Sequence, residues 1–508
     1  MRSSDSRLSR RAFLKARRPV RPSANLSPYV PSEANPWNAI KVRHLLRRIS
    51  LGARPEDVEA LLGLSPTEAI DQILDSALAR TDLADPSWID RRKPPGSASG
   101  DEKDAFNRSN QDWLKQVYID TINRLLGNEE SDLHARLGES LMERLTVFWS
   151  NHFVTEYREY RFATWLFRYR KTLRTHALGN VRQLVHDIGK RAAMLRYLNG
   201  DKSRNGAPNE NYARELLELF TMGITGPDGT ANYTQTDITE LARALTGWRL
   251  YPEREVEVFF DVIRHDGGNK TVFTRTEPFS YNDVAQLLFD ERSPQIAHFI
   301  AGKLYREFVS LEPDPDVIDA LAARLHAEDF VIEPVLRALL KSAHFFDAAN
   351  IGALIKSPVE MMLGAAYAFG LESVSSEDYG RFRFQARDLD QDLFNPPDVK
   401  GWRDGQSWIN TTTITERARR ARSEVYRAQN AIIADVISRP TAYDAPALAR
   451  ELYTELLTRA PEDAEMDELV ETLLAGTPEY AWDPTAGNGG RVRNYLLHLV
   501  SLPGFQLR

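Results

Sequence analysis

Four polar residues lie on one face of a helix predicted for the sequence NENYARELLELFTMG, which begins at Asn209. They recur at i, i+3, i+4 and i+7, the spacing of neighbours on an α-helix, and they are Asn211, Arg214, Glu215 and Glu218. Paired carboxylates could act as general acid and base on a glycosidic bond. Together with a nearby histidine, they could instead hold a divalent cation.

Other residues could join these four in one acidic pocket. The candidate catalytic residues are Glu215, Glu218 and Asp398. The candidate binding residues come from several separate segments, and they are His152, Asn211, Arg214, Asp237, Arg243, Trp248, His265, Asp266, Lys270, Trp402 and Trp408. The cofactor is left open, with a divalent cation as the one suggested. The structural alternative is that Arg214 and Arg243 are buried and pair with glutamates to join helices.

The loop FNPPDVKGWRDGQSWIN, from Phe394 to Asn410, differs in kind from the helices around it. Two prolines, two glycines and two tryptophans in an irregular loop are costly to order unless the loop packs against something. Exposed Trp402 and Trp408 beside Asp398 could grip sugar rings, although tryptophans also fill cores. Such a constrained loop is a good candidate for a functional site.

Two histidines have both a structural and a functional interpretation. His152 lies near the end of an amphipathic helix predicted from Met142 to Val154. A lone histidine on such a helix is usually a core residue whose hydrogen bonds are satisfied. The segment HDGGNK begins at His265 and is predicted to form the tip of a hairpin between strands at 255–262 and 271–273. A turn explains the aspartate and glycines but does not explain His265 or Lys270.

Helical periodicity dominates from Trp37 onward. Asn209 is predicted to cap a helix that runs from Glu210 to the residue before Gly223, about three and a half turns, and Thr234 with Asp237 fits a capping box for the next helix. We therefore predict an all-α, multi-helical globular body with a small β-hairpin insertion. Residues 37–508 form this helical domain, and a C-terminal helical subdomain from about residue 441 is the alternative to a single unit.

The net charge of −7 conceals a basic N-terminal segment. Residues 1–21 contain eight arginines and lysines against Asp5 alone, which leaves −14 on the rest of the chain. A body this acidic repels nucleic acid. No apolar run is long enough to span a bilayer, and the absence of cysteine excludes disulfides and thiolate sites.

Residues 1–36 are predicted to form a disordered basic leader. Ser9 to Lys15, SRRAFLK, matches the twin-arginine export pattern, but arginines and prolines follow where an apolar core is expected. The twin-arginine-like motif favours a periplasmic or extracellular location. The missing apolar core leaves a cytoplasmic location open.

The combined motifs resemble the bacterial family catalogued as domain of unknown function 1800 (DUF1800). The matching segments are NENYARELLEL, YTQTDITELARALTGW, HLLRRISLGARPEDVEALLGLSPTEAI, MERLTVFWSNHFV, HDGGNK, FNPPDVKGW and LPGFQ. The resemblance implies a mostly helical, usually exported protein, often encoded beside an uncharacterised sulfatase-like family. Many relatives have histidine where this chain has Phe220, so a mechanism that needs that histidine does not transfer.

Two function hypotheses follow, and whether the chain is an enzyme is left open. The first is a binding or assembly factor that acts with a sulfatase-like partner at the cell envelope, as the resemblance implies. The second is a carbohydrate-active enzyme that acts on an anionic polysaccharide through the acidic residues of NENYARELLEL and NPPDVKGW. The sequence contains no phosphate-binding loop, no nucleophile elbow and no zinc-protease motif.

Overall fold

The computed structural model describes residues 26–127, 130, 132–254, 257–487 and 489–508. These residues are mostly helical, and the strands form two small antiparallel sheets, so the predicted fold class is confirmed. Across the described residues, no helix combines the length and apolar character needed to cross a bilayer. The twin-arginine-like motif lies outside the described residues.

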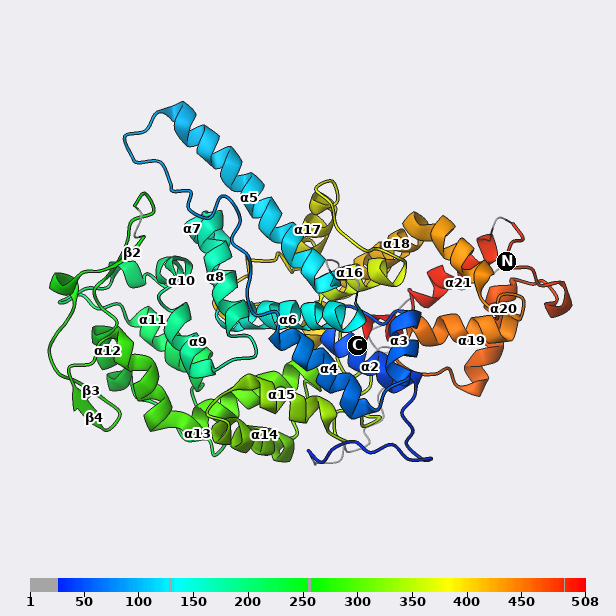
Figure 1. Ribbon diagram of the computed structural model, residues 1–508, viewed down its shortest axis with the longest axis horizontal. Coiled ribbons are helices and arrows are strands. Elements are labelled where there is room, and N and C mark those ends of the chain that lie inside the picture. Colours follow the sequence, from blue (N-terminus) through cyan, green and yellow to red (C-terminus); the bar gives the residue numbers. More distant parts are fainter. Residues whose placement is uncertain (1–25, 128–129, 131, 255–256, 488) are drawn as a thin grey trace.

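The first half of the helical body wraps around α6, which lies near the centre of the molecule (Figure 1). Its helices are α2 (Ala39–Ile49), α3 (Pro55–Leu62), α4 (Pro66–Leu78), α5 (Gly100–Leu126), α6 (Leu133–His152), α7 (Tyr157–Tyr160), α8 (Ala163–Thr175), α9 (Val181–Ile188) and α10 (Ala192–Tyr197). The beginning of α5 projects from the body at the top of the view.

The middle of the chain forms the left-hand end of the molecule in Figure 1 and then returns below α6. Its helical elements are η1 (Gly200–Lys202), α11 (Glu210–Glu215), η2 (Leu216–Thr221), α12 (Gln235–Ala244), η3 (Val262–Arg264), α13 (Tyr281–Phe308), α14 (Pro315–Ala327) and α15 (Ile332–Lys341). The strands are β1 (Trp248–Leu250), β2 (Val258–Phe260), β3 (Lys270–Val272) and β4 (Arg275–Glu277).

The last part of the chain extends to the right-hand end, while the C-terminus returns to the centre beside α2 and α3 (Figure 1). Its elements are α16 (Pro358–Ala368), α17 (Tyr379–Arg387), η4 (Gly405–Trp408), α18 (Thr411–Ser438), α19 (Ala445–Leu456), α20 (Asp463–Leu474), η5 (Glu479–Ala481), α21 (Gly490–Leu499) and η6 (Pro503–Gln506). The C-terminal subdomain from about residue 441 stays a prediction.

The predicted disorder of the leader does not extend to Tyr29. Its backbone N–H donates to the carbonyl of Lys341 at 2.8 Å, and its ring packs 4.9 Å from that of Phe346. Residues 28 and 342 also form an isolated antiparallel bridge. A buried aromatic residue therefore holds this part of the predicted leader against the helical body.

The predicted single hairpin is wrong in its pairing. β1 pairs with β2, so that Trp248 lies opposite Phe260, whereas β3 pairs with β4 as a separate hairpin. A tight turn follows β3, in which Phe273 adopts a left-handed backbone conformation, φ 55°. That turn reverses the chain immediately, so the HDGGNK segment connects the two sheets and is not a hairpin tip.

The helix predicted from Glu210 also changes form along its length. Asn209 caps it as expected, but the α-helix gives way after Glu215 to the π-helix η2. The Thr221 hydroxyl donates to the carbonyl of Leu216 at 2.6 Å, and the Gly223 N–H donates to the carbonyl of Leu217 at 3.1 Å. Gly223 has the expected left-handed conformation, φ 75°. π-Helices are rare and often occur at functional sites.

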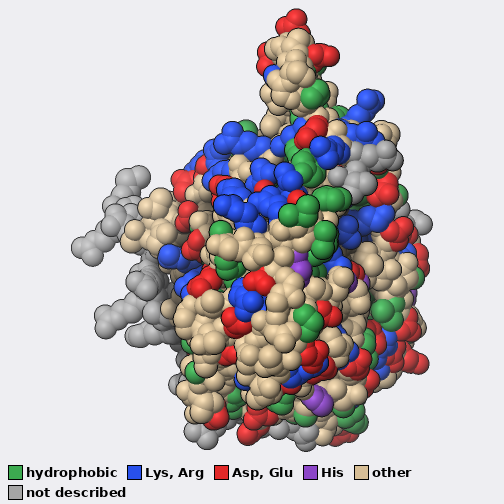
Figure 2. All heavy atoms as spheres, turned by 90° about the vertical axis from the view of Figure 1, so that its left-hand side faces the viewer, with side chains coloured by type: hydrophobic (Ala, Val, Ile, Leu, Met, Phe, Trp, Pro, Cys, Tyr) green, Lys and Arg blue, Asp and Glu red, His purple; other side chains and the backbone are tan. Residues whose placement is uncertain are grey.

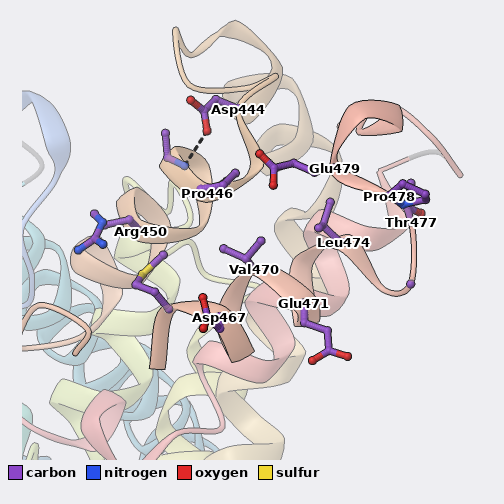
Figure 3. Close-up of a pocket in the computed structure, with 13 residues that line it drawn as sticks. Asp444, Pro446, Arg450, Asp467, Val470, Glu471, Leu474, Thr477, Pro478 and Glu479 are labelled. Carbon is purple, nitrogen blue, oxygen red and sulfur yellow. Dashed lines mark hydrogen bonds between the residues drawn. The ribbon is translucent and has the colours of Figure 1, made fainter. Parts of the chain in front are cut away.

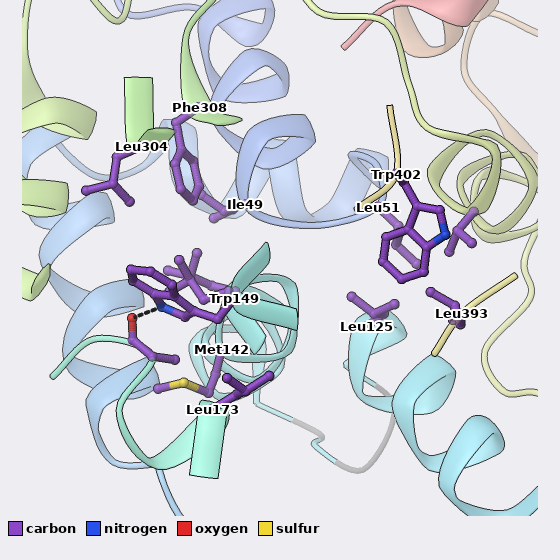
Figure 4. Close-up of a cluster of buried hydrophobic side chains, with 14 of the residues drawn as sticks. Ile49, Leu51, Leu125, Met142, Trp149, Leu173, Leu304, Phe308, Leu393 and Trp402 are labelled. Carbon is purple, nitrogen blue, oxygen red and sulfur yellow. Dashed lines mark hydrogen bonds between the residues drawn. The ribbon is translucent and has the colours of Figure 1, made fainter. Parts of the chain in front are cut away.

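A large apolar core surrounds α6 (Figure 4). Trp149 is fully buried there, and its indole N–H donates to the carbonyl of Ala177 at 2.9 Å. Beside this core, the carboxylate of Glu143 contacts Arg170 and Arg174, each at 2.9 Å, with all three side chains almost wholly buried. α6 is therefore anchored to α8 by both apolar packing and an internal ionic network.

Candidate functional site

The loop after Phe394 docks onto the end of α6. The backbone N–H of Trp402 donates to Oδ1 of Asn151 at 2.7 Å. Gly401 has φ 84°, and a Cβ at this position would approach the Asn151 carbonyl oxygen to 2.7 Å and its Oδ1 more closely still. The KGW sequence therefore requires glycine for both its conformation and its close approach to Asn151.

A second set of contacts fixes the start of the same loop. The backbone N–H of Tyr157 donates to the carbonyl of Phe394 at 2.8 Å, and that of Arg158 donates to Oδ1 of Asn395 at 3.1 Å. The Arg158 guanidinium also contacts Asp392 at 3.1 Å. The FWSNHF segment and the residues after it thus hold the NPPDVKGW loop at both ends.

Two of the three candidate catalytic residues, Glu215 and Asp398, act on the same group, the hydroxyl of Tyr197 at the end of α10, and Glu218 acts on Glu215. Burial raises the pKa of Tyr197, and so do the negative charges of Glu156, Asp398, Glu159 and Glu215. Burial also raises the pKa of Glu215, as does the neighbouring carboxylate of Glu218, whereas Arg214 and Lys400 lower it. We call Glu215, Glu218 and Asp398 the acidic cluster.

The acidic cluster is incompletely neutralised by its own protein. Within the described part of the chain, neither Glu215 nor Glu218 has an ion-pair partner within 4 Å, and both are half-buried. Asp398 is exposed and accepts a hydrogen bond of 2.8 Å from the backbone N–H of Lys400. The cluster therefore carries mutual repulsion that a cationic group would relieve.

His152 is a core residue that connects α6 to the π-helix. Its Nε2 lies 2.9 Å from the carbonyl oxygen of Phe220, and its ring lies 4.5 Å from that of Phe153. Burial and the charge of Lys303 lower its pKa to about 3. A neutral, enclosed imidazole of this kind matches the structural interpretation of His152.

The candidates on α12 and in HDGGNK connect that helix to the β3–β4 hairpin. The Asp237 carboxylate completes the predicted capping box with Thr234 and accepts from the Phe273 N–H at 2.6 Å. Arg243 contacts Asp266 at 2.8 Å, which helps to lower the pKa of that carboxyl group. These charges are satisfied within the protein.

The other two HDGGNK candidates are also held internally. His265 lies 3.1 Å from the carbonyl oxygen of Thr246, and its ring packs 5.3 Å from that of Phe260. Lys270 is fully buried, and its ammonium group donates to the carbonyl of Phe279 at 2.8 Å and to that of Asp266. A buried anchor explains the lysine that turn chemistry alone does not explain.

The tryptophans are not exposed sugar platforms. Trp402 and Trp408 are only 6% and 7% exposed, and Figure 4 shows Trp402 among Leu51, Leu125 and Leu393. Trp248 is half-buried, with its ring 5.2 Å from that of Phe260. Of the two interpretations left open for Trp402 and Trp408, the structure shows the one in which they fill the core, because both fold inward as the loop docks.

Arg214 and Asn211 lie on the outer side of α11. Arg214 is 40% exposed and contacts Glu210 at 3.4 Å and Gln235 at 3.1 Å. Asn211 is exposed, and its backbone N–H donates to the capping side chain of Asn209. The alternative in which Arg214 is buried and joins helices is therefore wrong, although its contact with Gln235 does bridge to α12.

No group of three or more His, Asp or Glu side chains is placed to hold a metal ion among the described residues. An open pocket of about 800 Å³ lies between α19 and α20, with Arg450, Asp467 and Val470 in its lining (Figure 3). A second, of about 480 Å³, lies between α13 and the loop at Gly226. The acidic cluster lines neither of them.

Sequence reasoning missed Asn151, Tyr197, Glu156 and Glu159 as parts of this region. Asn151 lies one residue before His152 in the FWSNHF segment, and this position was the sequence feature that could have identified it. Tyr197 has no local signal, because only the packing of α10 against α7 and α8 brings it toward the acidic cluster.

Comparison with known proteins gives a family and no activity. No curated protein and no solved structure matches this chain. The model of the family described as "Protein of unknown function (DUF1800)" matches residues 44–507, which include the acidic cluster and the NPPDVKGW loop. The chain therefore belongs to the DUF1800 family.

Proposed function

We propose that this protein is a binding and assembly factor whose acidic cluster receives a cationic group of a partner. The observation that carries the proposal is that Glu215 and Glu218 are half-buried and unpaired among the described residues, while Glu215 and Asp398, from a distant loop, both act on Tyr197. A lysine or arginine from a partner would offset the repulsion between these carboxylates. The partner class that the family resemblance implies is the sulfatase-like protein.

The contrast with the other charged candidates supports this choice. Arg243, Asp266 and Lys270 are satisfied by contacts within the protein, as expected of a structural network. The acidic cluster differs because its charges remain available. The SRRAFLK motif at residues 9–15 supports placing this assembly at the cell envelope.

The second candidate function is hydrolysis of an anionic polysaccharide. The observation that favours it is the raised pKa of Glu215 beside other carboxylates, a property that suits a general acid. The inward position of Trp402 and Trp408 counts against it, since no tryptophan of that loop is free to stack on a sugar ring.

The test is affinity capture from the native host with tagged protein, followed by mass spectrometry of bound proteins and glycans. The cluster variant is Glu215→Gln with Asp398→Asn, which removes two charges with little change in shape. The control is Glu59→Gln with Asp112→Asn, two exposed carboxylates far from the cluster in sequence that give the same change in net charge.

We expect wild type and control to retain a protein partner that the cluster variant loses. Equal recovery of that partner by all three proteins would contradict a role for the acidic cluster while leaving assembly in place. A glycan bound or shortened by the wild type and control but not by the cluster variant would favour the hydrolase function over the assembly function.

A further inference from the structure

Three apolar side chains close together in the sequence are exposed at the end of β2 and in the turn that follows it. Val262 and Ile263 are 72% and 87% exposed, so they make few contacts with their own protein. Phe259 on β2 is 48% exposed, whereas Phe260 points to the opposite face of the strand and packs against Trp248 and His265. We call Phe259, Val262 and Ile263 the apolar tip. An apolar patch of this kind in water usually marks an interaction surface.

Cationic side chains surround the apolar tip. Arg249 lies opposite Phe259 in the sheet, and Arg264 directly follows Ile263. The backbone N–H of Asn205 donates to the carbonyl of Arg264 at 2.7 Å, which brings the segment with Lys202 and Arg204 to the same place. The basic rim, as we call it, consists of Lys202, Arg204, Arg249 and Arg264.

Few acidic groups oppose this charge. Asp261 contacts Arg249 at 3.3 Å and its side chain also accepts from the Ile263 N–H, so it is engaged within the turn. The basic rim thus carries a net positive charge, although the net charge of the whole protein is −7. Figure 2 shows hydrophobic side chains beside a band of Lys and Arg side chains on this face, below the projecting end of the molecule.

We propose that the apolar tip and the basic rim bind the surface of an anionic lipid bilayer, with Val262 and Ile263 inserted between headgroups. Apolar side chains that protrude from a turn fit a bilayer interface, which needs no complementary cavity. The cations beside them would lie at the level of the anionic headgroups. This surface consists of different residues from the acidic cluster, so the inference goes beyond the proposed assembly role.

The observations favour a bilayer over an acidic protein. Interfaces between proteins concentrate their affinity in aromatic and arginine side chains that fill fitted pockets. Here the most exposed apolar side chains are aliphatic and occupy consecutive positions on the short turn η3. An acidic protein partner is therefore kept as an alternative outcome of the test.

The chain has no cysteine, so a single introduced cysteine gives a unique labelling site. Ile263→Cys carries a polarity-sensitive fluorophore, and Val30→Cys, at a residue 75% exposed elsewhere, is the matched control. Each labelled full-length protein is mixed with vesicles of phosphatidylglycerol and phosphatidylcholine, or of phosphatidylcholine alone. We expect a blue shift only for the label at position 263, only with the anionic vesicles, and weaker at high salt.

Vesicle sedimentation then measures affinity without a label. Val262→Ser with Ile263→Ser should lower partition onto anionic vesicles by about tenfold or more, as expected from the loss of two inserted aliphatic side chains. Val30→Ser with Ile224→Ser is the control and should bind like the wild type. Because every variant keeps the basic leader, the difference between the two pairs reports on the apolar tip alone.

Three results would overturn the proposal. They are an unchanged fluorescence at position 263, equal sedimentation of both serine pairs, and binding to neutral vesicles as strong as to anionic ones. Capture of an acidic protein that only the tip variant loses, without vesicle binding by the wild type, would assign the surface to a protein partner instead.

Discussion

Replacement of Gly401 by alanine should weaken the docking of the NPPDVKGW loop on α6. The residue has φ 84°, a conformation that costs a residue with a Cβ about 1–2 kcal/mol. The new Cβ would also enter the space of Asn151 and disturb the 2.7 Å hydrogen bond between Asn151 and the Trp402 N–H. Loss of that bond adds about 0.5–1.5 kcal/mol. We expect Gly401→Ala to lower the free energy of unfolding by about 1.5–3.5 kcal/mol.

Gly370 provides a matched control for this effect. It has φ 90°, but a Cβ there would meet no atom within 4 Å. Gly370→Ala should therefore cost only the conformational part, about 1–2 kcal/mol. Urea denaturation of both variants measures the two losses at unchanged slope. Equal losses would refute the reasoning, because the contact with Asn151 would then contribute nothing.

A double-mutant cycle makes the argument more specific. In an Asn151→Ala background, the closest atom to the new Cβ is gone and the hydrogen bond is already lost. Gly401→Ala should then cost less than in the wild type, by roughly 0.5 kcal/mol or more. Additive losses would mean that the two positions are not coupled in solution.

Three further predictions concern charge. Glu143→Gln should cost about 3–5 kcal/mol in urea denaturation because it leaves buried arginines without a full partner, whereas Glu210→Gln, which removes an exposed pair, should cost under about 1 kcal/mol. Burial lowers the pKa of Lys356 from 10.5 to about 7, so between pH 7 and pH 10.5 the unfolded chain binds more protons than the folded one, and the free energy of unfolding rises with pH. Lys356→Met should remove this rise. An unchanged dependence of stability on pH would contradict the attribution of the rise to Lys356. Burial and Glu218 raise the pKa of Glu215, so the charged carboxylate destabilises the folded protein at neutral pH, and this cost is removed as pH falls and the group is protonated. Glu215→Gln should therefore stabilise the protein by a few tenths of a kcal/mol at pH 7 and not at pH 4. Denaturation of both proteins at the two pH values measures this difference.

The local helix signals in the sequence were reliable because they depend on neighbouring residues. Thr234 and Asp237 form the predicted capping box, and Asn209 caps α11. The start of the π-helix at Leu216 was not predictable, since its apolar spacing also suits an α-helix. The hairpin pairing failed for a related reason: strand propensity near residue 258 was correct, but the partner strand begins at Trp248, directly after the helix, where the sequence carries no strand signal.

The candidate site was predictable only in part. The carboxylates of α11 were identified by their shared helix face, and Asp398 by the constrained loop that carries it. The sequence does not reveal which charges are already satisfied: Asp266 is paired with Arg243, whereas Glu215 has no ion-pair partner within 4 Å among the residues that the structure describes. The burial of Trp402 likewise depends on Asn151, which is 251 positions away in the chain.

The π-helix makes the geometry of the acidic cluster sensitive to the number of residues in the chain. A π-turn holds one residue more than an α-turn, so deletion of a single residue from Leu216–Thr221 would allow ordinary α-helical bonding to continue. The two ends of the segment would then turn by about 100° relative to each other. The face that carries Glu215 would no longer be in register with the Phe220 carbonyl that contacts His152. A one-residue deletion that spares Glu218 would thus change how Glu215 is oriented relative to the Phe220 carbonyl without altering any charge of the acidic cluster.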